Sequence, residues 1–122
     1  MQSLTDAVVA GAHDEEIDGV DVLVRHALEA TADEVLAADG YLFGTTANFG
    51  YMSGALKHFF DTIFLEAGGA LAEDGSAGAA GGGKKPFGLW VHGRYDTTGA
   101  VRSVLSIVGA LPWRQAADVL EV

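Results

Sequence analysis

The chain contains the stretch Tyr41-Leu-Phe-Gly-Thr-Thr-Ala-Asn-Phe-Gly-Tyr-Met-Ser-Gly-Ala55, which continues directly into Leu56-Lys-His-Phe-Phe-Asp61. An apolar run at 41–43 meets a polar, glycine-containing turn, and the turn leads into an amphipathic segment. In an open α/β sheet, small molecules bind in the loops at the carboxyl ends of the strands. The stretch therefore predicts a strand, a ligand-binding loop and a helix, in that order.

The helix after this loop has the clearest periodicity in the chain. Its apolar residues recur at positions i, i+3, i+4, i+7 and i+8, which gives a broad stripe that we expect to face the core. The residues of the stripe are Leu56, Phe59, Phe60, Ile63 and Phe64. Ser53 precedes the stripe and is the expected N-cap, because its hydroxyl can accept a hydrogen bond from the first turn. His58 is expected on the exposed side, and for Asp61 we expect a surface or packing role.

Strands and helices are predicted to alternate along most of the chain. The patterns indicate, in order, a helix over 4–12 opened by a capping box at Ser3, a strand over 20–25, a short helix capped by Thr31, a strand over 87–92, a helix near 101–108 and a last strand over 118–122. The Gly- and Ala-rich segment 67–85 cannot repay its ordering entropy through burial, so we expect a flexible surface loop there. Strands joined by helical crossovers indicate a parallel, right-handed α/β sheet.

Length and composition indicate one globular domain. The chain has 122 residues, of which 49% are hydrophobic, and this is enough for a real core. It has no cysteine, which excludes disulfides and thiolate metal sites, and His13 and His26 have no partners at metal-ligand spacing. No apolar run is long enough to span a bilayer and no secretory signal is visible, so we expect a cytoplasmic protein without a membrane partner.

The charge balance is strongly acidic, with a net charge of −10 at pH 7. Nucleic-acid binding needs clustered Lys and Arg, so this balance argues against a nucleic-acid partner. It fits a soluble enzyme, or an acidic electron carrier that docks on basic partners. A generically acidic composition explains it as well.

The loop after the strand at 41–43 has the groups that a flat, electron-rich ring needs. Such a ring needs backbone donors at its polar edge, an aromatic face beside it and a close approach of the backbone. The loop offers these features at Thr45, Thr46, Asn48, Phe49, Gly50 and Tyr51. The sequence shows no Ser-His-Asp order and no nucleophile elbow, so catalysis would have to come from a cofactor.

The same residues resemble the isoalloxazine-binding loop of the flavodoxin-like superfamily, especially its NAD(P)H-dependent FMN and quinone reductases. The matching positions are Gly44-Thr-Thr-Ala-Asn-Phe-Gly50, Met52-Ser-Gly-Ala-Leu-Lys57, Phe59 and Asp61. The family's loop proline is replaced by Thr46. The resemblance implies a three-layer α/β fold, with a parallel sheet and helices on both faces. It also implies FMN and NAD(P)H as cofactors, hydride transfer to a small-molecule acceptor (a quinone or a flavin), and self-association into a homo-oligomer.

The resemblance implies two groups of cofactor-binding residues. In the first loop they are Thr45, Thr46, Ala47, Asn48, Phe49, Gly50 and Tyr51. In a second loop, after the strand at 87–92, they are His92, Gly93, Arg94 and Tyr95. His92 is the candidate catalytic residue, as a hydrogen-bond donor or a proton source, and the alternative is a strand-end histidine satisfied by the backbone. Arg94 could meet a phosphate or an acidic cofactor edge, or it could form a surface salt bridge.

Compared with the family's pattern, the chain is expected to be incomplete at both ends. The resemblance implies a first strand with a phosphate-binding loop, lying between the strands at 20–25 and 41–45, and a last helix after residue 122. Without the phosphate-binding loop, FMN affinity is expected to be weak. Two alternatives to a reductase stay open: a non-enzymatic, flavodoxin-type electron carrier, and a truncated domain with weak or no flavin binding.

Overall fold

The sheet is the centre of the fold, and all of its strands run parallel. In the computed structural model, which describes residues 2–14, 19–68, 85–93 and 96–122, β1 (Tyr41–Thr46) pairs with β2 (Lys85–His92). The other edge of β2 pairs first with β3 (Trp113–Gln115) and then with β4 (Leu120–Glu121). The predicted parallel α/β class is therefore confirmed, with β2 between β1 on one side and the two short strands on the other.

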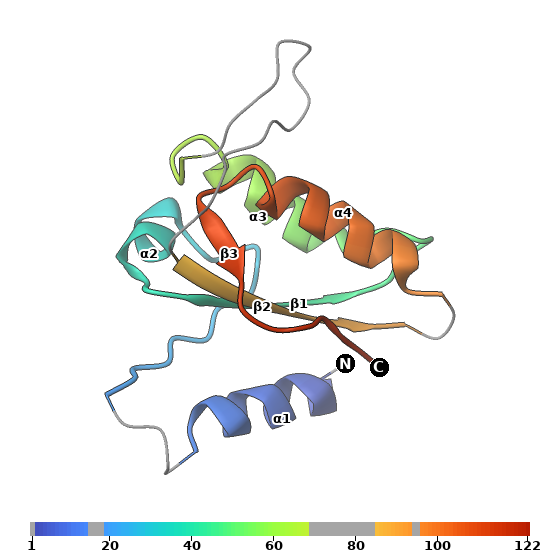
Figure 1. Cartoon of the computed structure of the whole chain (residues 1–122), viewed down its shortest axis with the longest axis horizontal. Coiled ribbons are helices and arrows are strands. Elements are labelled where there is room, and N and C mark those ends of the chain that lie inside the picture. Colours follow the sequence, from blue (N-terminus) through green and yellow to red (C-terminus); the bar gives the residue numbers. More distant parts are fainter. Residues whose placement is uncertain (1, 15–18, 69–84, 94–95) are drawn as a thin grey trace.

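Helices lie on both faces of this sheet (Figure 1). Both α3 (Gly54–Ile63) and α4 (Thr98–Val108) lie on one face, whereas α1 (Gln2–Ala12) lies on the other. The short helix α2 (Ala32–Ala37) precedes β1. This arrangement gives the three layers that were expected from the sequence.

Alternate residues of each strand point to opposite faces of the sheet. We call the face toward α3 and α4 the core face; its side chains are buried, and they are Phe43, Thr45, Phe87, Leu89 and Val91. We call the other face the open face; its residues are partly or largely exposed, and they are Leu42, Gly44, Gly88, Trp90 and Leu120. The same strands therefore support two very different surfaces.

The apolar stripe of α3 packs against the core face as predicted. Four of its five residues are buried and Phe64 is partly buried. The Ser53 hydroxyl accepts a hydrogen bond from the Leu56 N–H at 3.2 Å, which confirms the N-cap. On the outer side, His58 is exposed and Asp61 forms a surface ion pair with Lys57, with 2.6 Å between Oδ1 and Nζ. These contacts orient α3 and keep the loop before it at the carboxyl end of β1.

Aromatic rings fill the centre of the core. Phe43 lies 5.5 Å from both Phe60 and Trp113, measured between ring centroids, and Tyr41 lies 4.5 Å from Trp113. Pairs at such separations add about 0.5–1.5 kcal/mol beyond the burial of their area. The aromatic cluster therefore ties β1 to α3 and to the edge strand β3.

The strand predicted over 20–25 is not formed. These residues belong to no helix or strand, and Val20, Leu23 and Val24 are 59%, 60% and 51% exposed. A strand needs a neighbour to pair its backbone groups, and among the described residues β1 pairs with β2 alone. The alternating apolar residues therefore predicted a strand that does not form, and none of the described strands pairs with this segment.

The carboxyl-terminal edge of the sheet also differs from the prediction. A single strand was expected over 118–122, but β4 covers only Leu120–Glu121, and β3 at Trp113–Gln115 was not predicted. The two short strands share one edge of β2 because the chain leaves the sheet between them. Three residues after a proline carry too little pattern to indicate a strand.

The two predicted capping boxes have different outcomes. At α2 the box is confirmed, because the Thr31 hydroxyl accepts from the Glu34 N–H at 3.2 Å and the Glu34 carboxylate accepts from the Thr31 N–H at 3.1 Å. At the first helix, the helix itself is confirmed but begins at Gln2, so that Ser3 lies inside it. The helix near 101–108 is confirmed as α4, with Gly109 at its C-cap.

The predicted flexible loop at 67–85 is described only at its margins. Ala67 is 6% exposed and belongs to the core, and Lys85 is the first residue of β2. Residues 69–84 of the prediction lie outside the described part of the chain. Of the helices in the described ranges, none has the length and apolar character that crossing a membrane requires.

Candidate functional site

The loop at the carboxyl end of β1 folds into a tight turn over residues 48–51. Asn48 and Tyr51 exchange two backbone hydrogen bonds, with N–O distances of 2.7 and 2.9 Å. Phe49 and Gly50 between them have φ values of 50° and 75°, both in the left-handed region. Two consecutive left-handed residues are typical of a type I′ turn. Gly50 adopts this conformation without strain, whereas Phe49 is held in it by the turn.

The tip of this turn presents an aromatic ring and two free donors. Phe49 has a relative exposure of 109% and Tyr51 is 42% exposed. Within the described residues, the N–H groups of Phe49 and Gly50 have no hydrogen-bond acceptor. The turn therefore offers solvent a flat apolar face and adjacent backbone donors at Phe49 and Gly50, whereas the sequence analysis had looked for donors at Thr45, Thr46 and Asn48.

A buried threonine fixes the turn to α3. The Thr45 side chain is 2% exposed, and its hydroxyl accepts from the Ser53 N–H and donates to the Thr46 carbonyl, both at 2.8 Å. Thr46 donates its own hydroxyl to the Asn48 side-chain oxygen at 3.1 Å. The side chain of Thr45 therefore supports the loop from inside, while Thr46 and Asn48 stay closer to the surface.

A second link joins the turn to β2. The Ala47 N–H donates to the His92 carbonyl at 2.9 Å, and Thr46 and His92 are in register across the two strands. The two predicted loops are therefore neighbours at one end of the sheet. The His92 carbonyl is satisfied by this bond, but its half-buried ring has no hydrogen-bond partner among the described residues.

The rest of the second loop is described in part. The Gly93 N–H donates to the Val122 carbonyl at 3.1 Å, which ties this loop to the edge after β4. The predicted site residues Arg94 and Tyr95 lie outside the described part of the chain.

An aspartate that the sequence did not single out organises the start of α4. The Asp96 carboxylate accepts from the Thr98 hydroxyl at 2.6 Å and from the Thr98 N–H at 2.9 Å. These two bonds stabilise the ionised carboxylate and lower the pKa of Asp96 below its ordinary value of 3.8. Asp-Thr-Thr-Gly before an apolar helix is a capping pattern, so this signal was present in the sequence.

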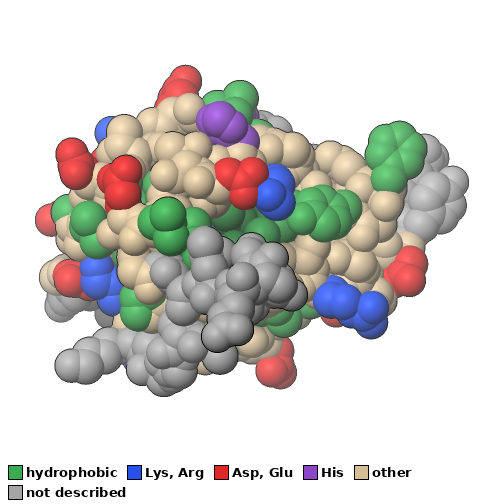
Figure 2. Space-filling view, turned by 90° about the horizontal axis from the view of Figure 1, so that it is seen from above, with side chains coloured by type: hydrophobic (Ala, Val, Ile, Leu, Met, Phe, Trp, Pro, Cys, Tyr) green, Lys and Arg blue, Asp and Glu red, His purple; other side chains and the backbone are tan. Residues whose placement is uncertain are grey.

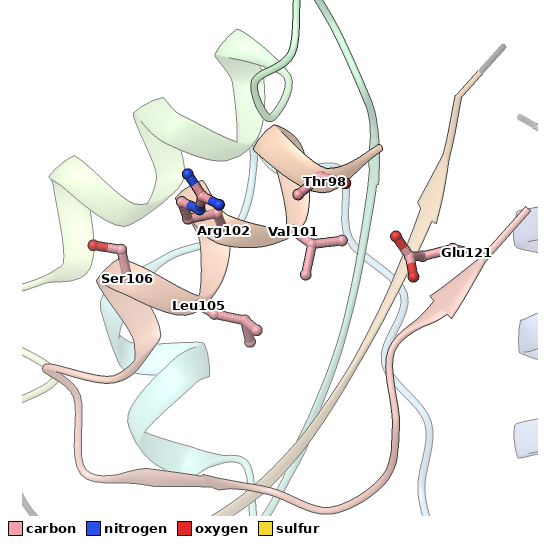
Figure 3. A pocket seen from close by; sticks show the side chains of 6 residues that line it. All are labelled: Thr98, Val101, Arg102, Leu105, Ser106 and Glu121. Atoms are coloured by element: carbon pink, nitrogen blue, oxygen red, sulfur yellow. The ribbon is translucent and has the colours of Figure 1, made fainter. Parts of the chain in front are cut away.

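An open groove lies elsewhere, between α4 and β4 (Figure 3). It has a volume of about 630 Å³, and its lining residues are Thr98, Val101, Arg102, Leu105, Ser106 and Glu121. None of the predicted site residues that the structure describes lines it. We place the candidate site at the 48–51 turn, because the turn combines an exposed ring with free backbone donors and the groove has no comparable set.

Charged groups are scattered over the face that carries α3 and α4. Figure 2 shows the basic side chains of the described residues standing apart from one another on this face. Phosphate recognition by nucleic-acid-binding proteins requires basic groups that gather on one surface. This face has no such patch among the residues described.

Two curated proteins are similar in sequence to this chain, whereas no protein-family model matches it. A flavodoxin from Aquifex aeolicus is 33% identical over 116 residues, an alignment that covers 80% of this chain and 60% of the flavodoxin. An NAD(P)H dehydrogenase (quinone) from Geobacter metallireducens is 40% identical over 57 residues, which are 47% of this chain and 26% of that protein. The chain thus spans less than two thirds of the length of either relative.

Proposed function

This chain is a flavodoxin-like α/β protein, and on that premise we propose that it binds FMN and transfers hydride from NAD(P)H to a quinone or flavin acceptor. The observation that carries the proposal is the 48–51 turn, which presents an exposed aromatic ring and free backbone donors at the carboxyl end of β1. The similarity to a quinone-reducing dehydrogenase supports NAD(P)H as the electron source.

The residues of the turn fit the ring portion of a flavin. The Phe49 ring can stack on the flat face, while the N–H groups of Phe49 and Gly50 can donate to the polar edge. Tyr51, which is 42% exposed, adds a second aromatic ring to the turn. When bound, FMN would supply the redox chemistry that the side chains of this protein lack.

His92 is the residue that we assign to the acceptor. Its main chain is bonded to the loop through Ala47, at the end of the sheet where the flavin is proposed to bind. The ring has no hydrogen-bond partner among the described residues, which leaves its nitrogens available to a quinone oxygen. An imidazole can donate a hydrogen bond or a proton to such an oxygen near neutral pH.

The first experiment measures flavin binding and turnover. The purified chain is titrated with FMN and with riboflavin by equilibrium dialysis, and NAD(P)H oxidation is then followed with a benzoquinone as acceptor. Because the proposed contacts are to the ring rather than to the phosphate, we expect the two Kd values to agree within about threefold. We expect both flavins to bind saturably and the oxidation of NAD(P)H to depend on the quinone. If neither FMN nor riboflavin binds, the proposal is rejected.

The exposed ring can be tested by Phe49→Asn. Asparagine accepts a left-handed conformation more readily than phenylalanine, so the free energy of unfolding should not fall. Loss of the stacked ring should raise the riboflavin Kd by about two- to tenfold, from an aromatic contact of about 0.5–1.5 kcal/mol. Leu65→Asn is the matched control, because Leu65 is an apolar residue outside the loop with 68% exposure. An unchanged Kd in Phe49→Asn would remove Phe49 from the site.

The second candidate is an electron carrier with bound FMN. The longer of the two similarities is to a flavodoxin, and the net charge of −10 suits docking on basic partners. The same experiment separates the two functions. A carrier binds flavin but oxidises almost no NAD(P)H with a quinone until a separate reductase is added. The proposed reductase oxidises NAD(P)H without any added reductase.

A further inference from the structure

We infer that two residues of α4, Gly99 and Ser103, are positioning residues that set where the 48–51 turn holds the flavin ring. The inference rests on the proposed function, because only a ring-binding turn gives this positioning a role in activity. Neither residue is among the predicted site residues: Ser103 bonds to the end of the turn at Met52, and Gly99 lies against the backbone of Gly50. They lie at positions i and i+4 of one helix and therefore on the same side of it.

Ser103 holds the end of the turn with a hydrogen bond. Its hydroxyl accepts from the Met52 N–H at 3.2 Å and donates to the Ala100 carbonyl at 2.9 Å. Met52 is 2% exposed, so its N–H is removed from water and depends on this acceptor. The bond links the loop after β1 to a helix that follows β2, and it fixes the residue next to Tyr51.

Gly99 holds the turn by close approach. A Cβ atom at position 99 would lie 1.9 Å from the Gly50 carbonyl oxygen and 2.9 Å from the Gly50 carbonyl carbon. Real Cβ atoms do not come so near to a backbone, so any side chain at this position must push the turn away. The absence of a side chain at Gly99 therefore lets the tip of the turn rest on α4.

The helix is a firm support at this point. Asp96 holds its first turn through two hydrogen bonds to Thr98, and Val104 and Ala100 are completely buried against the sheet. Together with the Thr45 and Ala47 links, α4 holds the turn from a third element. A left-handed phenylalanine is strained when free, and a rigid support on several sides keeps it in place.

The first test needs no flavin. Amide hydrogen exchange is measured by NMR at Tyr51 and Met52 in the free protein. Ser103→Ala should speed exchange at these amides by about three- to tenfold, from the loss of one hydrogen bond. Ser103→Thr keeps the hydroxyl and should restore the slow exchange. The matched control is Ser106→Ala, because Ser106 is an exposed residue of the same helix whose side chain has no hydrogen bond to a described residue.

The second test measures riboflavin binding and the free energy of unfolding in the same variants. Ser103→Ala and Gly99→Ala should each raise the Kd by about threefold or more, and Ser103→Thr should return it to the wild-type value. Alanine favours a helix more than glycine does, so weaker binding by Gly99→Ala would not reflect a poorer helix. Gly11→Ala is the control, since a Cβ there meets no atom within 4 Å.

The outcomes separate the two proposals. If the wild type binds no flavin, the proposed function fails, and the exchange rates still decide whether α4 positions the turn. If the wild type binds flavin, the positioning role is rejected when Ser103→Ala matches it in exchange and both Ser103→Ala and Gly99→Ala match it in Kd. A change in unfolding free energy alone, with exchange at the turn and Kd unchanged, would show a purely structural role and also reject it.

Discussion

The core face and the open face of the sheet are built from alternate residues of the same strands, yet they differ in almost every packing property. On the core face, Val91 is fully buried and Phe43 is 8% exposed. On the open face, Leu42 is 57% and Leu120 is 48% exposed. Because neighbouring residues of one strand share the same backbone, strand propensity cannot explain the difference. It comes from what covers each face.

The helices on the two faces show the same contrast. α3 and α4 each bury at least three apolar residues against the core face. Over residues 4–12 of α1, on the opposite side, every residue is partly or fully exposed. We conclude that the stability of the described structure comes mainly from one face of the sheet, which is also the face whose helices hold the 48–51 turn.

The largest expected difference in the free energy of unfolding is between substitutions at two aliphatic residues. One residue packs against the core face and the other lies on the open face. Ile63→Ala, from the fully buried end of α3, should lower the free energy of unfolding by about 2–5 kcal/mol through lost burial and a cavity. Leu42→Ala, on the open face, should cost less than about 1 kcal/mol. Urea unfolding followed by far-UV circular dichroism gives both values. Equal losses would mean that the open face is covered in solution.

Packing on the open face can be tested with Gly44→Ala. Gly44 pairs in register with Trp90, and a Cβ at this position would lie 2.1 Å from the Trp90 Cζ2 atom. The indole must move, and overpacking of this kind costs about 1–3 kcal/mol. In a Trp90→Leu background the cost should shrink, which a double-mutant cycle measures. A stable Gly44→Ala protein would show that the indole is free to leave.

A smaller effect is expected at the margin of the core face, from Tyr41→Phe. The Tyr41 hydroxyl donates to the Val35 carbonyl at 2.5 Å and so links β1 to α2. Removing it should cost about 0.5–1.5 kcal/mol at neutral pH. Urea unfolding of the two proteins at neutral pH gives this difference, and equal stabilities would show that the bond contributes nothing.

The same hydroxyl makes the difference depend on pH. Burial raises the pKa of Tyr41 above 10.0, the Asp39 carboxylate adds to the rise, and the Trp113 side chain opposes it. Because the pKa of Tyr41 is raised in the folded state, the contribution of its hydroxyl to the free energy of unfolding is complete below pH 10. This contribution is lost as the pH rises through the pKa of the folded state. The gap between wild type and Tyr41→Phe should therefore close in alkaline solution. A difference in stability that persists in alkaline solution would show that the Tyr41 hydroxyl is not its source.

The smallest effect concerns the start of α4, which helps to cover the core face. The pKa of Asp96 is lowered below 3.8, so its stabilising bonds to Thr98 are present above that pH and are lost as the pH falls through the lowered value. In Asp96→Asn the side-chain oxygen can still accept but does not titrate. The protection factor of the Thr98 amide, which compares its exchange with that of an unstructured amide at the same pH, should therefore fall in acid in the wild type and stay nearly constant in Asp96→Asn. If the wild type and Asp96→Asn lose protection at Thr98 to the same extent in acid, groups other than Asp96 cause the loss.

The parts of the fold that sequence predicted well depend on residues close together in the chain. The strand, turn and helix over 41–63 could be predicted because the apolar stripe and the Ser53 cap are local patterns. The failed strand over 20–25 has a local pattern too, but a strand also needs a neighbour from elsewhere in the chain. The sequence of a segment does not show whether a distant segment will pair with it.

The candidate site shows the same limit. Phe49 and Gly50 could be proposed from residue type, because aromatic and glycine residues in a strand-end loop are typical of ring binding. The supports behind them could not, since Ser103 lies 51 positions after Met52 and looks like any small residue of an amphipathic helix. Thr45 was predicted as a cofactor-binding residue, but its side chain lies buried on the core face, where its hydroxyl accepts from the Ser53 N–H.

The two tryptophans are divided between the two faces, which gives the protein a pair of built-in optical probes. Trp113 is 6% exposed on the core face, whereas Trp90 stands on the open face, and its buried indole N–H has no acceptor among the described residues. Replacing either one with phenylalanine leaves an emission spectrum that belongs to one face alone. The order in which the two signals change during unfolding would then show whether the layers of this fold separate together or one at a time.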